Sequence, residues 1–161
     1  MSATSGRRSA GLLLWRRQAG EVEVLLGHMG GPFWSRKDAG AWTIPKGEYD
    51  ATEDPLVAAR REFVEELGQP VPDAEPVPLG EVRQSGGKRV LAWAVEGDLD
   101  PATMVSNTVE IEWPPRSGRR MLVPELDRCA WFPLPAAHDA LLVGQRPLLE
   151  RLTALLAPPQ A

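Results

Sequence analysis

One segment, residues 47–69 (GEYDATEDPLVAARREFVEELGQ), constrains this chain more than any other. It carries five glutamates in 23 residues. Asp54 is a typical N-cap, Pro55 fits the first turn of a helix, and Gly68 is a typical C-terminal stop. The segment therefore predicts a helix over residues 55–67, with the last three glutamates on it.

Helical periodicity sorts the side chains of this predicted helix into two neighbouring arcs. The apolar arc holds Leu56, Ala59, Phe63 and Leu67, and the arc beside it holds Ala58, Glu62, Glu65 and Glu66. Three carboxylates so close repel one another unless their pKa values rise or a cation neutralises them. Oxygen ligands without His or Cys suit Mg²⁺ or Mn²⁺. The alternative is a solvated acidic helix face without a metal.

The spacing of this segment resembles the signature box of the Nudix hydrolases, which cleave a nucleoside diphosphate linked to another moiety. Gly47 is followed after five residues by Glu53 and after seven more by the run REFVEELG, residues 61–68. Every polar and glycine position of the box is matched, while Phe63 and Gln69 depart from its hydrophobic positions. The resemblance implies an α+β fold, the α/β/α sandwich with a mixed sheet.

The resemblance also implies roles for individual residues. Mg²⁺, or Mn²⁺ in its place, would be held by the Gly47 carbonyl, Glu62, Glu65 and Glu66. Glu66 or a later acid would accept the proton of the attacking water, Arg61 would hold the glutamates in position, and Glu53 would orient Arg61 or complete the site through water. The candidates for the later acid are Glu110, Glu112 and Glu125, and the sequence does not choose among them.

Cations and aromatic side chains indicate further contacts with substrate. Lys46 precedes Gly47 directly, and the glycine-rich loop over residues 28–40 sets Trp34 beside Arg36 and Lys37. Such a loop can stack a base and hold a phosphate, or it can be an ordinary connection. Arg116 lies in the basic segment 114–120, which is either a second phosphate contact or an exposed turn. His28 is interpreted as structural.

Residues outside the box favour one branch of the family. Ser9-Ala10-Gly11 and residues 42–47 (WTIPKG) resemble the branch that handles diadenosine polyphosphates and nucleoside triphosphates. The predicted function is therefore metal-dependent hydrolysis of a diphosphate bridge in such a nucleotide. ADP-ribose or another sugar nucleotide is the alternative substrate, and a non-catalytic module that senses a nucleotide is the alternative of another class.

Composition bounds the class of protein and its partners. The 161 residues suit one domain, and the net charge of −4 comes without a basic block, so we expect no nucleic-acid polymer as partner. Cys129 is the single cysteine, which fits a reducing cytoplasm and a small core residue. We expect a soluble cytoplasmic protein with no membrane association. The oligomeric state stays open.

The remaining elements follow from alternation, apolar runs and turn residues. We predict disorder over residues 1–8, one Nudix domain over residues 9–157 and a frayed tail over residues 158–161. The expected strands are residues 10–16, 21–27, 42–45, 79–84, 88–96, 108–113 and 129–132. The expected terminal helices are residues 135–143 and 146–157, on either side of Gly144.

Overall fold

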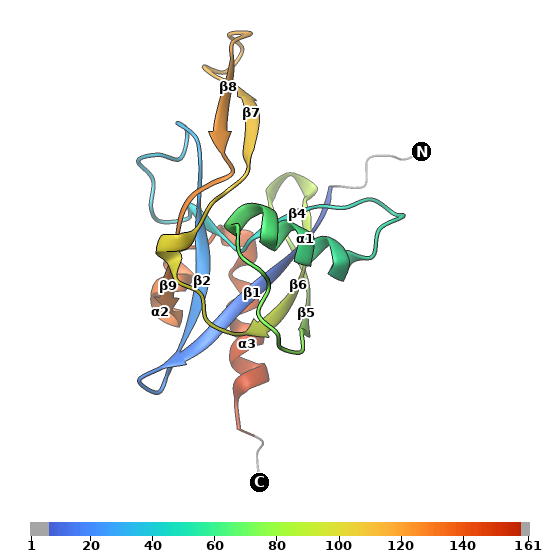
Figure 1. Ribbon diagram of the computed structural model, residues 1–161, viewed down its shortest axis with the longest axis vertical. Coiled ribbons are helices and arrows are strands. Elements are labelled where there is room, and N and C mark those ends of the chain that lie inside the picture. The colour runs from blue at the N-terminus through green and yellow to red at the C-terminus, as the bar shows by residue number, and fades with distance from the viewer. Residues whose placement is uncertain (1–6, 159–161) are drawn as a thin grey trace.

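The computed structural model describes residues 7–158 and has a mixed sheet at its centre (Figure 1). The strands run in the order β3-β2-β1-β6-β5, with β4 paired to β1 and β9 paired to β2. Only the β1–β6 pair is parallel among the pairs of this sheet. The bounds are β1 Arg8–Gln18, β2 Glu21–Met29, β3 Trp42–Thr43, β4 Lys46–Glu48, β5 Val77–Arg83, β6 Arg89–Glu96 and β9 Leu126–Pro133.

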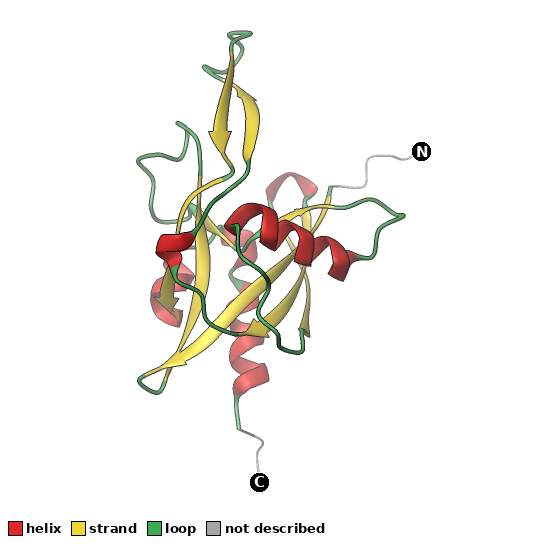
Figure 2. Cartoon of the chain, viewed as in Figure 1, coloured by secondary structure: helices red, strands yellow, loops and turns green. Residues whose placement is uncertain are grey.

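Helices cover both faces of this sheet (Figure 2). Helix α1, Pro55–Leu67, packs on one face, while α2, Leu134–Ala140, and α3, Pro147–Leu156, pack on the other. Strand β1 is buried on both faces: Leu12 and Leu14 belong to the core under α1, and Leu13 to the core under α3. This double burial explains why β1 reads as a continuous apolar run. The predicted α/β/α sandwich with a mixed sheet is confirmed.

The ends of α1 are those predicted from the sequence. The Asp54 side chain accepts a hydrogen bond from the Leu56 amide at 3.3 Å and so satisfies an amide that has no partner within the helix. Gly68 has φ 67°, and its amide donates to the Val64 carbonyl at 2.8 Å. Glycine takes this left-handed conformation at little cost, which ends the helix.

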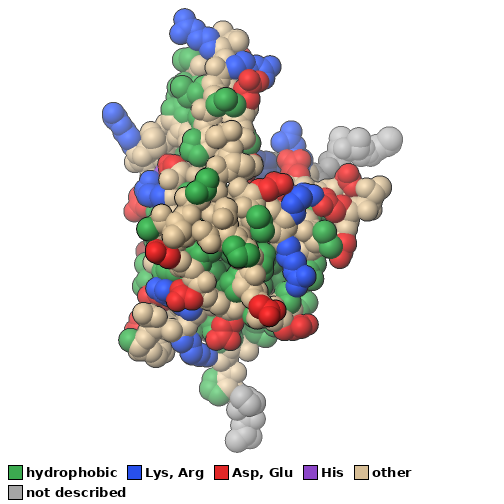
Figure 3. All heavy atoms as spheres, in the orientation of Figure 1, with side chains coloured by type: hydrophobic (Ala, Val, Ile, Leu, Met, Phe, Trp, Pro, Cys, Tyr) green, Lys and Arg blue, Asp and Glu red, His purple; other side chains and the backbone are tan. Residues whose placement is uncertain are grey.

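A two-stranded ribbon projects away from the sandwich at the top of Figure 1. It consists of β7, Thr108–Glu112, and β8, Arg120–Pro124, which pair antiparallel. Strand β8 was not predicted. Its short apolar run lies between arginines and a proline, and this pattern alone does not indicate a strand. Pairing with β7 makes the segment a strand. The ribbon carries exposed hydrophobic side chains, with Leu122 70% exposed, and basic groups near its tip (Figure 3).

Other element ends differ from the sequence predictions. Disorder was predicted for residues 7 and 8 and is wrong there: Arg8 pairs with Arg89, and the Arg7 carbonyl accepts the Arg89 amide at 2.9 Å. Parallel pairing with β6 thus orders the start of β1. Helix α2 ends earlier than predicted because Leu141 forms a bridge with Trp42.

Short 3₁₀ turns occupy several connections, namely Ser85–Gly87, Pro101–Thr103 and Val143–Gln145. The rest of the predicted N-terminal disorder, residues 1–6, and residues 159–161 of the predicted frayed tail lie outside the described residues. No helix within residues 7–158 has the length and apolar character needed to cross a membrane.

Candidate functional site

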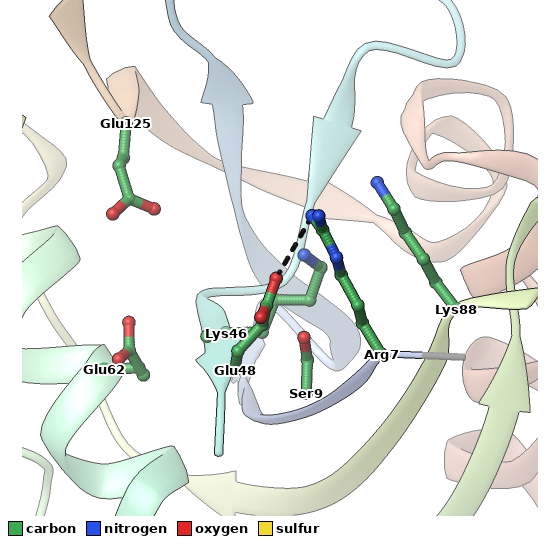
Figure 4. Close-up of a pocket in the computed structure, with 8 residues that line it drawn as sticks. Arg7, Ser9, Lys46, Glu48, Glu62, Lys88 and Glu125 are labelled. Atoms are coloured by element: carbon green, nitrogen blue, oxygen red, sulfur yellow. Dashed lines mark ion pairs between the residues drawn. The ribbon is translucent and has the colours of Figure 1, made fainter. Parts of the chain in front are cut away.

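A cavity of about 360 Å³ opens beside α1, where β4, the starts of β1 and β6, and the link between β8 and β9 meet (Figure 4). Its volume is in the range of small-molecule sites. Charged side chains dominate its wall. The lining residues are Arg7, Ser9, Lys46, Gly47, Glu48, Glu62, Lys88 and Glu125.

The three glutamates near the end of α1 have different surroundings. Glu62 and Glu66 lie one turn apart on the face packed toward the sheet and are 8% and 3% exposed. Glu65 is 45% exposed at its side chain and lies on the outer side of the same helix. The helical period therefore buries two of the predicted metal ligands and leaves the third at the surface.

Glu66 contacts a second carboxyl group. Burial and a hydrogen bond with Glu125 raise the pKa of Glu66 to about 10. Its Oε1 also accepts the Lys46 backbone amide at 3.2 Å. Burial lowers the pKa of the nearby Lys46 ammonium. Burial and the nearby Glu125 carboxyl group both disfavour a negative charge on Glu66, so this side chain holds a proton more tightly than an exposed glutamate does.

Gly47 is required by the close approach of α1 to β4. A Cβ atom at this position would lie 1.9 Å from Cδ of Glu62 and 2.0 Å from its Oε1. No other residue fits without displacing the carboxyl group. Burial raises the pKa of Glu62, while Arg61 opposes this shift. Glycine thus lets a buried carboxyl group rest directly on the β4 backbone.

Arg61 connects the box glutamates to one another. Its guanidinium bonds to Glu53 and, at 3.0 Å, to Glu62, and it lies 3.8 Å from Glu65. The same group reaches the Glu48 carbonyl at 3.5 Å. These carboxylates raise the pKa of Arg61, which stays charged. Arg61 and Glu53 therefore lie where their predicted positioning roles require.

The donor set suits a hard divalent cation. Carboxylates and a backbone carbonyl are the ligands that Mg²⁺ and Mn²⁺ prefer. Within residues 7–158, no three His, Cys, Asp or Glu side chains already converge in a metal-binding arrangement. A cation beside Glu66 and Glu125 would relieve the repulsion between carboxyl groups that contributes to the raised pKa of Glu66. The chemistry of the residues present thus fits a metal ion held by Gly47, Glu62, Glu66 and Glu125, with Glu65 beside them.

The structure separates the three candidates for a later acid. Glu110 pairs with Arg120 at 3.1 Å, and Glu112 accepts the Gly118 amide at 2.7 Å, so both side chains make contacts within the ribbon. Glu125 follows β8 directly and lines the cavity. Its Oε1 also accepts from the Asn107 side chain at 3.0 Å. The chain returns from the ribbon toward α1 at this point, and this return brings Glu125 close to the helix.

Of the predicted substrate contacts, only Lys46 lines the cavity. Trp34, Arg36 and Lys37 lie in the loop between β2 and β3, and Arg116 lies in the loop that joins β7 to β8. The Lys37 ammonium is 3.6 Å from the ring centre of Phe33 and 5.5 Å from that of Trp34. Neither segment lines the cavity that contains Glu62 and Glu125.

His28 is fully buried and ties this loop to the sheet. Its Nδ1 lies 2.9 Å from the Asp127 carboxyl group, and its Nε2 lies 2.6 Å from the Lys37 carbonyl. Both contacts agree with the structural interpretation of His28.

Sequence reasoning missed two of the three cations of the wall, Arg7 and Lys88. Arg7 was assigned to a disordered start, and Lys88 was read only as the first residue of a strand. Both precede a strand directly, Arg7 before β1 and Lys88 before β6. A single charged residue before a strand does not indicate a binding site. The two residues become recognisable as neighbours only when the pairing of β1 with β6 is known.

Comparison with known proteins shows similarity to this chain in sequence and in fold. The model of the NUDIX domain matches residues 6–152. An 8-oxo-(d)GTP phosphatase of Mycolicibacterium smegmatis is 32% identical over 149 residues, which are 83% of this chain and 37% of that protein. The chain thus spans little more than a third of the length of this curated relative.

Solved structures show the same fold. A Caenorhabditis elegans Ap4A hydrolase in a binary complex has a TM-score of 0.62 and 25% identity, covering 93% of this chain and 97% of that one. The NUDIX domain of Shewanella oneidensis NrtR, complexed with ADP ribose, has a TM-score of 0.65 at 17% identity, covering 98% and 91%. The domain match over most of the chain shows that the chain belongs to the NUDIX family, and these likenesses show its fold.

Proposed function

We propose that the protein is a metal-dependent hydrolase that cleaves a diphosphate bridge in a nucleoside diphosphate derivative. Diadenosine polyphosphates and nucleoside triphosphates are its first candidate substrates. The observation that carries the proposal is the buried Glu66 carboxyl group next to the partly buried Glu125, beside the charged cavity that Gly47, Glu62 and Glu125 line. The unpaired Cys129 supports action in the cytoplasm.

Members of this family generally need divalent metal ions. When bound, Mg²⁺ or Mn²⁺ supplies charge neutralisation at the phosphate oxygens and lowers the pKa of a bound water. The ligands in this chain would be the Gly47 carbonyl, Glu62, Glu65 and Glu66, with Glu125 joining them. Arg61 keeps Glu62 and Glu65 in place, and Glu53 fixes Arg61.

Proton transfer is the task of the Glu66 and Glu125 pair. Burial and the neighbouring Glu125 raise the pKa of Glu66, and a carboxyl group with a raised pKa is a stronger base toward the proton of a water. We assign to Glu66, with Glu125 as the alternative, the role of taking the proton from the attacking water. Lys46 is placed to meet an oxygen of the phosphate chain at the same cavity.

The loop between β2 and β3 and the loop between β7 and β8 lie outside the cavity. We assign their predicted contacts to parts of the substrate that lie farther from the cleaved bond. Trp34, with its neighbour Phe33 under the Lys37 ammonium, offers an aromatic surface for a base. Arg36 lies between Trp34 and Lys37 in the chain. Arg116 would reach a distal phosphate only if the ribbon approaches the bound substrate.

The names of the relatives favour a phosphate chain over a sugar nucleotide. Relatives at 25% identity or more include an 8-oxo-(d)GTP phosphatase and an Ap4A hydrolase. The structure with ADP ribose is 17% identical and supports the fold alone. A non-catalytic sensor is disfavoured because Glu53, Glu62, Glu65 and Glu66 are all present.

Product analysis tests the proposal directly. Purified protein is incubated with and without Mg²⁺ with diadenosine tetraphosphate, ordinary and 8-oxo nucleoside triphosphates, and ADP-ribose. Chromatography of the products then identifies the bond that is cut. We expect metal-dependent cleavage of a phosphate-chain substrate. Cleavage of ADP-ribose alone would move the proposal to the sugar-nucleotide alternative. Nucleotide binding without turnover of any substrate would replace the hydrolase with the sensing module.

A further inference from the structure

We infer that Arg7 and Lys88, together with Lys46, form a subsite for phosphate groups that lie beyond the bond being cleaved. The inference rests on the proposed function, because it names what the same cavity holds next to the scissile bridge. It adds two residues to the site that no motif indicates. It also predicts a preference for substrates with more than two phosphates in a row.

The parallel pairing of β1 and β6 places Arg7 and Lys88 next to each other. Arg8 pairs with Arg89, and the Arg7 carbonyl accepts the Arg89 amide at 2.9 Å. The residues that precede the two strands therefore lie at the same end of the sheet. Figure 4 shows the side chains of Arg7 and Lys88 extending along the same side of the cavity, across from Glu62 and Glu125.

Strand β4 separates the two kinds of charge. Ser9 pairs with Glu48 and Gly11 with Lys46, while Gly47 between them lies against Glu62 of α1. Neighbouring side chains of a strand point to opposite faces, so Lys46 and Glu48 face away from α1. Lys46 thus lies on the side of Arg7 and Lys88 (Figure 4). The carboxyl groups of α1 lie on the other side, and the cavity joins both.

Within residues 7–158, the cations of this subsite have few partners. Lys46 and Lys88 form no ion pair within 4.0 Å, and Arg7 pairs only with Glu48, at 3.6 Å. The side chains of Arg7 and Glu48 are 72% and 62% exposed, so water screens their attraction. A phosphate oxygen can therefore replace Glu48 as the partner of Arg7 at little cost.

The sum of charges supports an elongated anion as the occupant. The lining holds three cations, Arg7, Lys46 and Lys88, and three carboxyl groups, Glu48, Glu62 and Glu125. A divalent cation on the α1 side would make the whole cavity positive. A nucleoside triphosphate or a dinucleoside tetraphosphate presents charged groups along its whole chain. ADP-ribose presents a neutral ribose beyond its second phosphate and leaves the cations unpaired.

Steady-state kinetics of the double variant Arg7→Ala/Lys88→Ala test the subsite. With Mg²⁺ present, we expect KM for diadenosine tetraphosphate to rise about tenfold or more, as the loss of charge-assisted hydrogen bonds predicts. We expect kcat to change less than about threefold, since neither side chain contacts the carboxyl pair. KM for ADP-ribose should change less than about twofold.

Two matched variants control this experiment. Arg17→Ala removes a positive charge from the opposite end of β1, where Arg17 is exposed, and should leave both substrates unaffected. Lys88→Arg keeps the charge and should retain most of the affinity for the tetraphosphate. Thermal unfolding of each variant confirms that it is folded. A loss shared by Arg17→Ala would assign the effect to net charge and overturn the subsite.

The two proposals fail in different ways. Wild-type turnover with equal KM in the double variant would overturn the subsite and leave the hydrolase in place. Equal losses on both substrates would likewise overturn it. If no substrate is turned over, calorimetric titration with inorganic tripolyphosphate in the presence of Mg²⁺ decides: weaker binding by the double variant than by Arg17→Ala supports the subsite, and equal binding overturns it.

Discussion

The two sides of the cavity differ in how the chain builds them. The acidic side comes from one helix, α1, and a single later residue, Glu125. The cationic side comes from Arg7, Lys46 and Lys88, which belong to three segments far apart in sequence. A helix repeats its side chains at a fixed period, so a short segment reveals its charged face. A sheet joins distant segments, and its composite surface becomes visible only when the strands are paired.

The two sides also differ in burial. Glu62 and Glu66 are 8% and 3% exposed, whereas the Arg7 side chain is 72% exposed. Charges act strongly where water is excluded and weakly where it is present. The acidic side is therefore suited to chemistry, and the cationic side to capture of a charged substrate. Variants on the acidic side should mainly lower kcat, and variants on the cationic side should mainly raise KM.

The largest effect is expected at Glu66. Glu66→Gln keeps the shape of the side chain but removes the proposed metal ligand and proton acceptor. We expect kcat to fall at least about 100-fold, a barrier increase of about 2.7 kcal/mol. Single-turnover and steady-state kinetics with Mg²⁺ measure it. Glu65→Gln should also lower kcat, though less, because Glu65 is half exposed. Activity within about threefold of wild type for both variants, under about 1 kcal/mol, would remove these glutamates from the mechanism.

Metal binding gives a second measurement on the same variant. A ligand that binds the folded state alone raises the melting temperature, so Mg²⁺ should stabilise the wild type. The shift should be smaller for Glu66→Gln. Equal shifts in the two proteins would show that Glu66 does not hold the ion.

The next largest effect is expected at Gly47. A methyl group there would meet the Glu62 carboxyl group at 1.9 Å, so Gly47→Ala must displace either that group or β4. We expect kcat/KM to fall about 30-fold, or about 2 kcal/mol, through misplacement of Glu62. Kinetics and circular dichroism together separate this local change from unfolding. Gly86→Ala controls for backbone strain alone, since nothing lies within 4 Å of the added methyl group but the φ of 78° disfavours alanine. Full activity of Gly47→Ala would show that Glu62 need not rest on β4.

A smaller effect is expected at Glu125 and separates it from the other two candidate acids. Glu125→Gln removes one member of the carboxyl pair, and we expect kcat to fall about tenfold, or about 1.4 kcal/mol. Glu110→Gln and Glu112→Gln alter only ribbon contacts and should leave kcat within about twofold of wild type. Assays of the three variants at equal metal concentration make the comparison. A larger loss for either ribbon variant would reverse the assignment.

The smallest effect on activity is expected at Cys129, which belongs to neither side of the cavity. Burial raises the pKa of its thiol to about 11. The folded state therefore favours the protonated thiol, and the stability that this gives is lost as the pH rises from the ordinary value of 9.0 toward about 11.

At pH 8, iodoacetamide should alkylate the folded protein at least about tenfold more slowly than the urea-unfolded chain. Cys129→Ala should leave kcat unchanged. Rapid alkylation of the folded protein, or a large loss of activity in Cys129→Ala, would contradict the buried, non-catalytic assignment.

The ends of α1 and the first two strands were predictable because their signals are local, whereas the sandwich architecture was implied by the resemblance to the Nudix hydrolases. Asp54, Pro55 and Gly68 act on the backbone next to them, and the apolar run of β1 reflects burial on both faces. Strand β8 was missed because its pairing with β7, rather than its own residues, makes it a strand. Helix α2 ended early because Leu141 forms a bridge with Trp42, and the Leu142 amide donates to the Trp42 carbonyl, in a strand distant in sequence.

The sequence by itself determined the family, the position of α1 and the set of carboxylates that α1 carries, because a helix fixes the spacing of its own side chains. Tertiary structure decided which later acid joins them and which cations face them. Glu125 reaches Glu66 only through the ribbon, and Arg7 meets Lys88 only through the parallel pairing of β1 with β6. Such contacts depend on the pairing of distant segments, which no local pattern of residues encodes.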